Sequence, residues 1–168
     1  MTMIENTKTK VALPSDEEIL ITRTFDAPRD LVWQMWTVAE HLQQWWGPEG
    51  WTLPVCEMDF RPGGAWFYCM RGPDGMQSCG KTTYLEIDAP ERIVYEDAFA
   101  DADGNLLEEM PVAHITLTFI EAGGKTSVNS NVRYPTKADR DKVIEMGMEA
   151  GIDQTLNRLE AYLAQNLQ

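Results

Sequence analysis

A long run of strand-like segments in the middle of the chain constrains its fold most. Between residues 51 and 134, six stretches rich in β-branched and aromatic residues alternate with short turn sequences such as RPGG, GPDG, DAPE and EAGGK. Turns this short join antiparallel neighbours, whereas parallel neighbours need a crossover of about a dozen residues or more. The run therefore predicts an antiparallel meander, and the stretch ILITRTF after Glu18 predicts a seventh strand that precedes it.

Helical patterns lie on both sides of this run. Residues 26–28, Asp-Ala-Pro, have the composition of a helix start, and apolar residues then recur every three or four positions from Leu31 to Trp46. This spacing fits one bent helix or two short ones, and we expect two short helices that end at Gly47-Pro48. A second apolar stripe predicts a long C-terminal helix from about residue 137 to residue 164.

The order of these elements predicts the architecture. A seven-stranded sheet has one face that needs covering, and the C-terminal helix is the element long enough to lie across it. The fold class is therefore α+β, a helix-grip fold: a seven-stranded curved antiparallel sheet wrapped around a long C-terminal helix, with two short helices after the first strand. Gly147 and Gly151 lie within that helix. Each costs about 1 kcal/mol relative to alanine, so we expect another segment to approach closely there or to need room.

Length and charge set the domain organisation and exclude some partners. The 168 residues fit one domain, in which a polar N-terminal arm (residues 1–16) precedes a single domain (residues 17–165). No apolar run reaches the roughly 18 residues of a membrane span, and the first residues lack the apolar core of a secretory signal, which predicts a cytoplasmic location. The net charge of −13 disfavours binding to nucleic acid or anionic lipid.

The six tryptophans all fall between Trp33 and Trp66. Such a cluster forms either a stiff local core or the mouth of a pocket, and a curved sheet that diverges from a straight helix leaves a cavity between them. The candidate residues for lining that cavity share a large apolar or aromatic side chain and a position on the expected inner surface. They are Trp46, Trp51, Met58, Trp66, Tyr68, Met70, Tyr95, Met148, Ile152 and Leu156. The alternative is that these residues form ordinary core.

The inward faces of two strands stay open at this point. Alternate residues 66, 68 and 70 are apolar, but so are residues 65, 67 and 69, which point to the opposite side. In the segment 112–120, alternation favours a solvent-facing His114, although an inward polar face would make this histidine the titratable group of the cavity.

The sequence offers little that points to catalysis or metal binding. Neither His41 nor His114 has acidic or cysteine neighbours at ligand spacing, so we expect no metal and no cofactor. The three cysteines (Cys56, Cys69 and Cys79) are odd in number and lack a C-x-x-C spacing, which favours structural free thiols over a reactive one. The acidic segment 101–109 lacks the spacing of a calcium loop and is expected to be a solvated, mobile loop, with a gate to the cavity as a further role.

Four stretches together resemble a known family. They are FDAPRDLVWQMWTVAEHLQQWWGPEGW, CEMDFRPGGAWFYCMRGPDG, YLEIDAPERIVYEDAF and MGMEAGIDQTLNRLEAYL, in the expected order over about residues 17–164. The chain is similar to the family related to the activator of the heat-shock-protein-90 ATPase, within the START-like (SRPBCC) superfamily of helix-grip domains. One departure is Ile152 after Gly151, where this branch often has a tryptophan; the smaller side chain enlarges the cavity or changes its packing.

The resemblance implies three functional hypotheses. Members of the superfamily bind lipids, sterols, polyketides or plant hormones in the cavity, so the first is binding of a small apolar or aromatic ligand. The second is a cyclase- or hydrolase-like enzyme on an aromatic or polyketide-like substrate, for which the sequence offers Tyr68, Tyr84, Tyr95, Glu57 and His114 without a defined catalytic set. The third is a chaperone-interacting module like the eukaryotic co-chaperone. Exposed strand edges and aromatic helix faces also suggest a homodimer.

Overall fold

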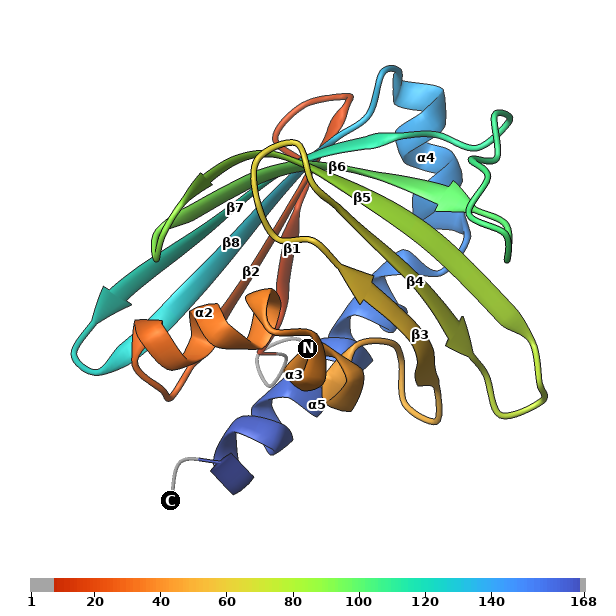
Figure 1. The fold of residues 1–168 in the computed structure, drawn as a ribbon. Coiled ribbons are helices and arrows are strands. Elements are labelled where there is room, and N and C mark those ends of the chain that lie inside the picture. Colours follow the sequence, from red (N-terminus) through yellow and green to blue (C-terminus); the bar gives the residue numbers. More distant parts are fainter. Residues whose placement is uncertain (1–7, 167–168) are drawn as a thin grey trace.

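The chain folds around one antiparallel sheet, seen in a computed structural model that describes residues 8–166 (Figure 1). The strands are β1 (Lys10–Ala12), β2 (Glu18–Phe25), β3 (Thr52–Met58), β4 (Ala65–Arg71), β5 (Gln77–Asp88), β6 (Arg92–Ala100), β7 (Ala113–Ala122) and β8 (Lys125–Arg133). The helices are α2 (Arg29–Thr37), α3 (Ala39–Trp45), α4 (Lys137–Glu145) and α5 (Met148–Asn166). The strand order β1-β2-β8-β7-β6-β5-β4-β3 confirms the predicted meander from β3 to β8 and the α+β class.

The sheet has eight strands, so the prediction of seven is wrong by one. The additional strand is β1, which pairs with β2 through Lys10↔Thr22 and Ala12↔Leu20. It lies inside the segment expected to be a flexible arm, whose residues 1–7 are outside the described part of the chain. A strand of three residues is too short to show a periodic pattern, so its pairing depends on the edge that β2 presents.

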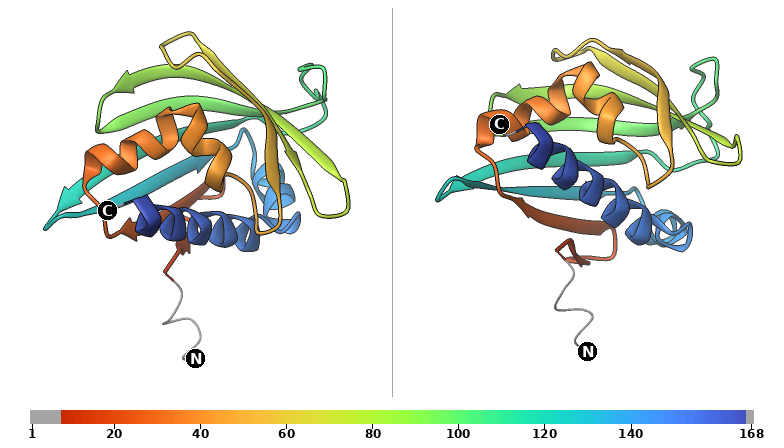
Figure 2. Two further views of the ribbon diagram at one scale, coloured as in Figure 1. Left: turned by 60° about the horizontal axis from the view of Figure 1, so that its bottom comes forward. Right: turned by 90° about the horizontal axis from the view of Figure 1, so that it is seen from below.

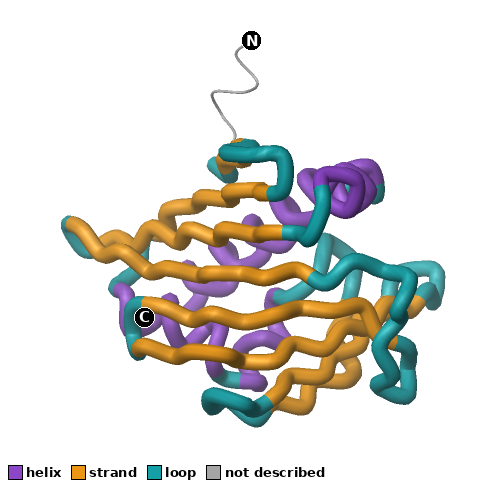
Figure 3. The backbone as a smooth tube through the Cα atoms, turned by 90° about the horizontal axis from the view of Figure 1, so that it is seen from above, coloured by secondary structure: helices purple, strands orange, loops and turns teal. Residues whose placement is uncertain are grey.

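The sheet is curved, and the helices occupy its concave side. Figure 2 shows α2, α3 and α5 within the curve of the strands, and Figure 3 views the sheet from outside with most of the helical segments behind it. Register shifts interrupt the β3–β4 pairing after Thr52 and the β5–β6 pairing after Tyr84. Such irregularities bend a strand and increase its twist, which is how the meander closes over the helices.

The C-terminal helical segment is divided, contrary to the single long helix expected. Helix α4 ends at Glu145 and α5 begins at Met148, because Gly147 between them adopts a φ of +89°. That backbone conformation is open to glycine at little cost. At Gly151, a side chain would meet Pro48 at an ordinary contact distance of 3.8 Å, so this glycine is not required by a close approach. The two short helices predicted after the first long strand are present as α2 and α3.

Alternation on β7 settles the face that the sequence left open. Ala113, Ile115, Leu117 and Phe119 are buried against the helices, whereas His114 is exposed with its Nδ1 3.9 Å from Glu96. The solvent-facing interpretation of His114 is therefore confirmed. On β4, Trp66 and Tyr68 are almost fully buried on the inner face.

Two of the three cysteines form a disulfide, which the sequence interpretation as free thiols did not predict. Cys69 and Cys79 are direct partners across β4 and β5, and their sulfur atoms are bonded. The pairing follows from strand register, which the ten-residue separation alone does not reveal. Cys56 remains a free thiol that accepts a 3.3 Å hydrogen bond from the Trp66 indole, and burial raises its pKa. A raised pKa fits a structural thiol.

Candidate functional site

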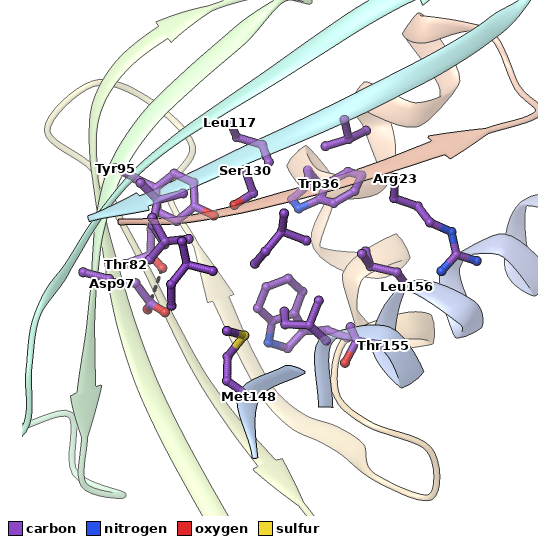
Figure 4. A pocket seen from close by; sticks show the side chains of 18 of the residues that line it. Arg23, Trp36, Thr82, Tyr95, Asp97, Leu117, Ser130, Met148, Thr155 and Leu156 are labelled. Carbon is purple, nitrogen blue, oxygen red and sulfur yellow. Dashed lines mark hydrogen bonds between the residues drawn. The ribbon is translucent and has the colours of Figure 1, made fainter. Parts of the chain in front are cut away.

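A pocket lies between the concave face of the sheet and helix α5 (Figure 4). It has a volume of about 210 Å³, and its walls are mostly apolar. Helix α5 contributes Met148, Ile152 and Leu156, which share one face because they are four residues apart. The sheet side and the short helices contribute Ile19, Ile21, Trp36, Trp45, Trp46, Trp66, Ala113, Ile115, Leu117, Val128 and Val132.

The tryptophan cluster forms one wall of this pocket as well as part of the core. Trp45 is fully buried and meets Trp36 and Trp46 edge to face, with ring centres 4.9 and 5.4 Å apart. Trp46 continues the chain of contacts to Trp66 at 5.0 Å. Edge-to-face arrangements are a preferred geometry of aromatic pairs, so these four indole rings stabilise one another within the wall. Four of the six tryptophans thus belong both to the core cluster and to the pocket wall.

The structure brings together six of the ten sequence-predicted lining residues. Trp46, Trp66, Tyr95, Met148, Ile152 and Leu156 line the pocket. Tyr68 and Met70 instead line a second, smaller pocket of about 100 Å³ on the β4–β5 side. Trp51 lies against Gly72, and Met58 packs on the core opposite Trp66, so neither lines either pocket. A role of any of these residues in binding stays a prediction.

The main polar group of the pocket is Asp97 of β6, which the sequence analysis missed. Its carboxylate accepts a 3.1 Å hydrogen bond from the Thr82 hydroxyl to Oδ1, and the Tyr68 hydroxyl lies 3.2 and 3.3 Å from Oδ1 and Oδ2. Burial raises the pKa of Asp97 to about 6, while the hydrogen bonds from Thr82 and Tyr68 oppose that rise. Asp97 lines both pockets and is therefore reachable from either.

Four tyrosines surround this carboxylate. Burial is the main cause that raises the phenol pKa of Tyr68, Tyr84 and Tyr95, and the negative charge of Asp97 raises it further. The same two causes raise the pKa of Tyr134 to about 12. All four hydroxyls are therefore neutral near pH 7 and able to donate hydrogen bonds. Figure 4 shows the Tyr95 hydroxyl directed into the pocket, on the side where Ser130 lies.

Arg23 of β2 forms the opposite end of the pocket. Its side chain is 1% exposed and donates hydrogen bonds to Glu160 at 2.6 Å and to Thr9 at 2.7 Å. Asp153 adds a second carboxylate at 3.9 Å, and Nε is buried with no hydrogen-bond partner in the described chain. The guanidinium points towards α5 and away from the centre of the pocket (Figure 4). The aliphatic stem of Arg23, rather than its charge, therefore faces the cavity.

One signal in the sequence could have found both charged residues. Asp97 has the same strand parity as Ile93 and Tyr95, and Arg23 has the same parity as Ile19 and Ile21. A charged residue in register with an apolar face points inward and needs a partner or a function. By contrast, Glu57 and His114, which the sequence offered for catalysis, are exposed on the outside of the sheet.

The acidic segment 101–109 contributes no residue to the pocket between the sheet and α5. In the acidic segment 101–109, Asp101 accepts hydrogen bonds from the backbone N–H groups of Asp103 and Asn105, both at 2.9 Å, which closes a local turn. Across residues 8–166, no three His, Cys, Asp or Glu side chains gather closely enough to hold a metal ion. In the same residues, no helix is long and apolar enough to cross a membrane.

Comparison with known proteins agrees with this fold and places the chain in a family. The family model described as activator of Hsp90 ATPase homolog 1-like protein matches residues 26–164. The chain belongs to this family. No curated protein matches the sequence.

Solved structures of bacterial proteins are similar over nearly the whole chain. The protein Ms6760 from Mycobacterium smegmatis is 32% identical with a TM-score of 0.85, and the match covers 92% of this chain and 96% of that one. A protein from Staphylococcus epidermidis is 38% identical with a TM-score of 0.79, covering 95% and 96%. A protein from Arthrobacter aurescens is 30% identical with a TM-score of 0.85, covering 95% and 93%. This chain therefore shares its fold with these three proteins over nearly its whole length.

Proposed function

We propose that this protein binds a small, mainly apolar ring compound in the pocket between the sheet and α5. The observation that carries the proposal is the composition of the pocket wall, in which aliphatic and indole side chains surround a few hydroxyls and one carboxylate. Ligand sites in proteins are typically concave and apolar, with few polar groups that fix the orientation of the ligand. Membership of a START-like family adds support.

The volume of the pocket limits the size of the ligand. An engineered cavity of about 150 Å³ in another protein binds benzene, and pockets for drug-sized molecules span about 300–1,000 Å³. The value of about 210 Å³ lies between these, which favours a molecule of one or two rings. A sterol or a long-chain lipid would require the helix and sheet to move apart.

The test is isothermal titration calorimetry with propylbenzene, indole and naphthalene, and with cholesterol and palmitate as larger probes. We expect binding of the ring compounds and none of the larger probes. Ile152→Trp places an indole in the pocket and should abolish binding, whereas Ile120→Trp, the same change at an exposed site on the outer face of β7, should not. Equal binding by both variants, or silence of all three ring compounds, would contradict the proposal.

The other two hypotheses have less support. An enzyme would have Asp97 and Tyr95 as its candidate acid–base groups in the pocket, because Glu57 and His114 lie outside it. A chaperone-interacting module stays a prediction from the family resemblance, and a homodimer stays a prediction from exposed strand edges and aromatic helix faces.

A further inference from the structure

We propose that the ligand of this pocket is a small ring compound with one protonated amino group, which the Asp97 carboxylate binds. This inference rests on the proposed function and adds the chemical class of the ligand. It begins from the position of Asp97 on β6, where the two pockets meet. The side chain lies beside its cross-strand partners Thr82 and Ala113, within reach of a molecule in the larger pocket.

Asp97 has no basic partner in the described chain to balance its charge. Asp97 accepts hydrogen bonds from two neutral hydroxyls, but across residues 8–166 no ion pair joins it to a lysine, arginine or histidine. Buried carboxylates in proteins are usually paired with a cation or protonated. A ligand that carries a positive charge would supply the missing partner of the ionised carboxylate.

The Asp97 carboxylate has hydrogen-bond acceptor sites that the described residues leave unused. A carboxylate has about four lone-pair positions, and Oδ1 receives both Thr82 and Tyr68. Oδ2 has a single and longer contact, at 3.3 Å from the Tyr68 hydroxyl. Oδ2 therefore keeps acceptor capacity for a further donor, and an ammonium group has three N–H donors to offer.

The side chains that line the pocket with Asp97 favour a cation over an anion. The indole and phenol rings of Trp46, Trp66 and Tyr95 line the same pocket, and aromatic faces attract cations. An anionic ligand would meet the like charge of Asp97 at this end. At the other end, Arg23 is already bound to Glu160 and directs its charge away from the cavity. The pocket therefore selects against a carboxylate or phosphate.

The titration behaviour around Asp97 makes the proposal testable by pH. The titratable groups that face it are Tyr68 on β4, Tyr84 on β5, Tyr95 on its own strand and Tyr134 after β8. Their phenols are neutral at all pH values below about 9, because the pKa of each is raised. From β7 and α5, Ala113 and Met148 face the pocket without a charge. A change in affinity between pH 5 and 7.5 therefore reports Asp97.

The experiment compares three probes with one ring and three head groups: 2-phenylethylamine, propylbenzene and 3-phenylpropionate. At pH 7.5 we expect the amine to bind at least tenfold more tightly than propylbenzene, and the carboxylate more weakly than both. Lowering the pH to 5 should weaken amine binding about tenfold, because most of Asp97 is then protonated while an alkylamine keeps its charge. Propylbenzene binding should not change.

Two variants of neighbouring residues complete the test. Asp97→Asn keeps the shape of the side chain and should lower amine affinity at least tenfold while leaving propylbenzene affinity within twofold. Glu96→Gln removes one negative charge from the next residue, on the exposed outer face of β6, and should change neither. Retained propylbenzene binding shows that a variant is folded, and the pH series on the unmodified protein decides the question if Asp97→Asn does not fold.

The outcomes separate this inference from the proposed function. Equal affinities for the amine and propylbenzene at pH 7.5, or an amine affinity that does not depend on pH, would overturn the inference and leave the proposed function intact. Silence of all three probes would overturn both.

Discussion

Arg23 and Asp97 are charged residues on the inner face of the sheet, at opposite ends of one pocket, and their surroundings differ. Arg23 is held by two carboxylates and the Thr9 hydroxyl, in a network that joins β2, α5 and the residues before β1. Asp97 has two hydroxyl donors and, in the described chain, no basic partner. A buried charge that is paired within the chain serves the fold, whereas a charge in a cavity without a basic partner is available to a ligand.

Breaking the ion pair between Arg23 and Glu160 should have the largest effect on stability. Glu160→Gln leaves the Arg23 guanidinium buried with only the more distant Asp153 as a carboxylate partner. We expect the free energy of unfolding at pH 7 to fall by between about 2 and 3 kcal/mol, below the range for breaking a fully buried ion pair because the Glu160 side chain is 41% exposed. Urea denaturation followed by circular dichroism measures it. Glu149→Gln, at an exposed position in the first turn of the same helix, should change it by less than about 0.5 kcal/mol. A loss of similar size in both variants would show that the Arg23 network has no special role.

Neutralising Asp97, which has no basic partner among residues 8–166, should instead raise the free energy of unfolding. The pKa of Asp97 is raised to about 6 from 3.8, so the folded protein binds more protons than the unfolded chain between these values and its stability falls as pH rises. Asp97→Asn removes this cost. Because the Asp97 side chain is only partly buried, the full pKa shift overstates its effect on stability. We expect the variant to be more stable than the unmodified protein by about 2 kcal/mol at pH 8 and by nearly nothing at pH 4.

Thermal unfolding of both proteins across pH 4 to 8 measures that difference. Glu96→Gln serves as the matched control, because Glu96 is exposed and next to Asp97 in sequence. If the Asp97→Asn difference stays constant over the range, Asp97 does not titrate there and the contrast with Arg23 is lost.

A smaller effect is expected from removing a hydrogen bond to Asp97 while both charges stay in place. Thr82→Val keeps the shape of a side chain that is 1% exposed but deletes the hydroxyl donor to Asp97. Since that hydrogen bond lowers the pKa of Asp97, its loss should move the pKa above 6 and cost about 1 kcal/mol of stability at pH 8. Carboxyl carbon shifts followed by NMR across pH 4 to 8 measure the pKa directly. An unchanged or lower pKa would mean that Thr82 does not stabilise the carboxylate.

The sequence predicted the elements better than the ends of elements or their partners. Alternation and short turns were enough for the meander and for the outward position of His114. The strand β1 was missed because three residues carry no period, and the division at Gly147 was missed because the apolar stripe continues across it. The Cys69–Cys79 bond depends on which residues face each other across β4 and β5, which is a property of register.

The sequence predicted several of the apolar residues that line the candidate site but not its charged residues. Met148, Ile152 and Leu156 follow from helical spacing, and Trp46 and Trp66 follow from the aromatic cluster. Trp51 and Met58 fall outside because the depth of a residue along a curved sheet cannot be read from its parity. Asp97 was overlooked because an isolated acidic residue in a strand usually faces solvent, and its true environment arises only from Tyr68 and Thr82 on neighbouring strands.

Locating a bound ring compound tests most directly whether the pocket between the sheet and α5 is the binding site. In a sample labelled on isoleucine and leucine methyl groups, 2-phenylethylamine should show nuclear Overhauser contacts to Ile115, Ile152 and Leu156, which line the pocket from opposite sides. We expect these contacts at pH 7.5. Contacts to an exposed methyl group such as that of Ile120 in place of these, or none at saturating concentration, would contradict this expectation.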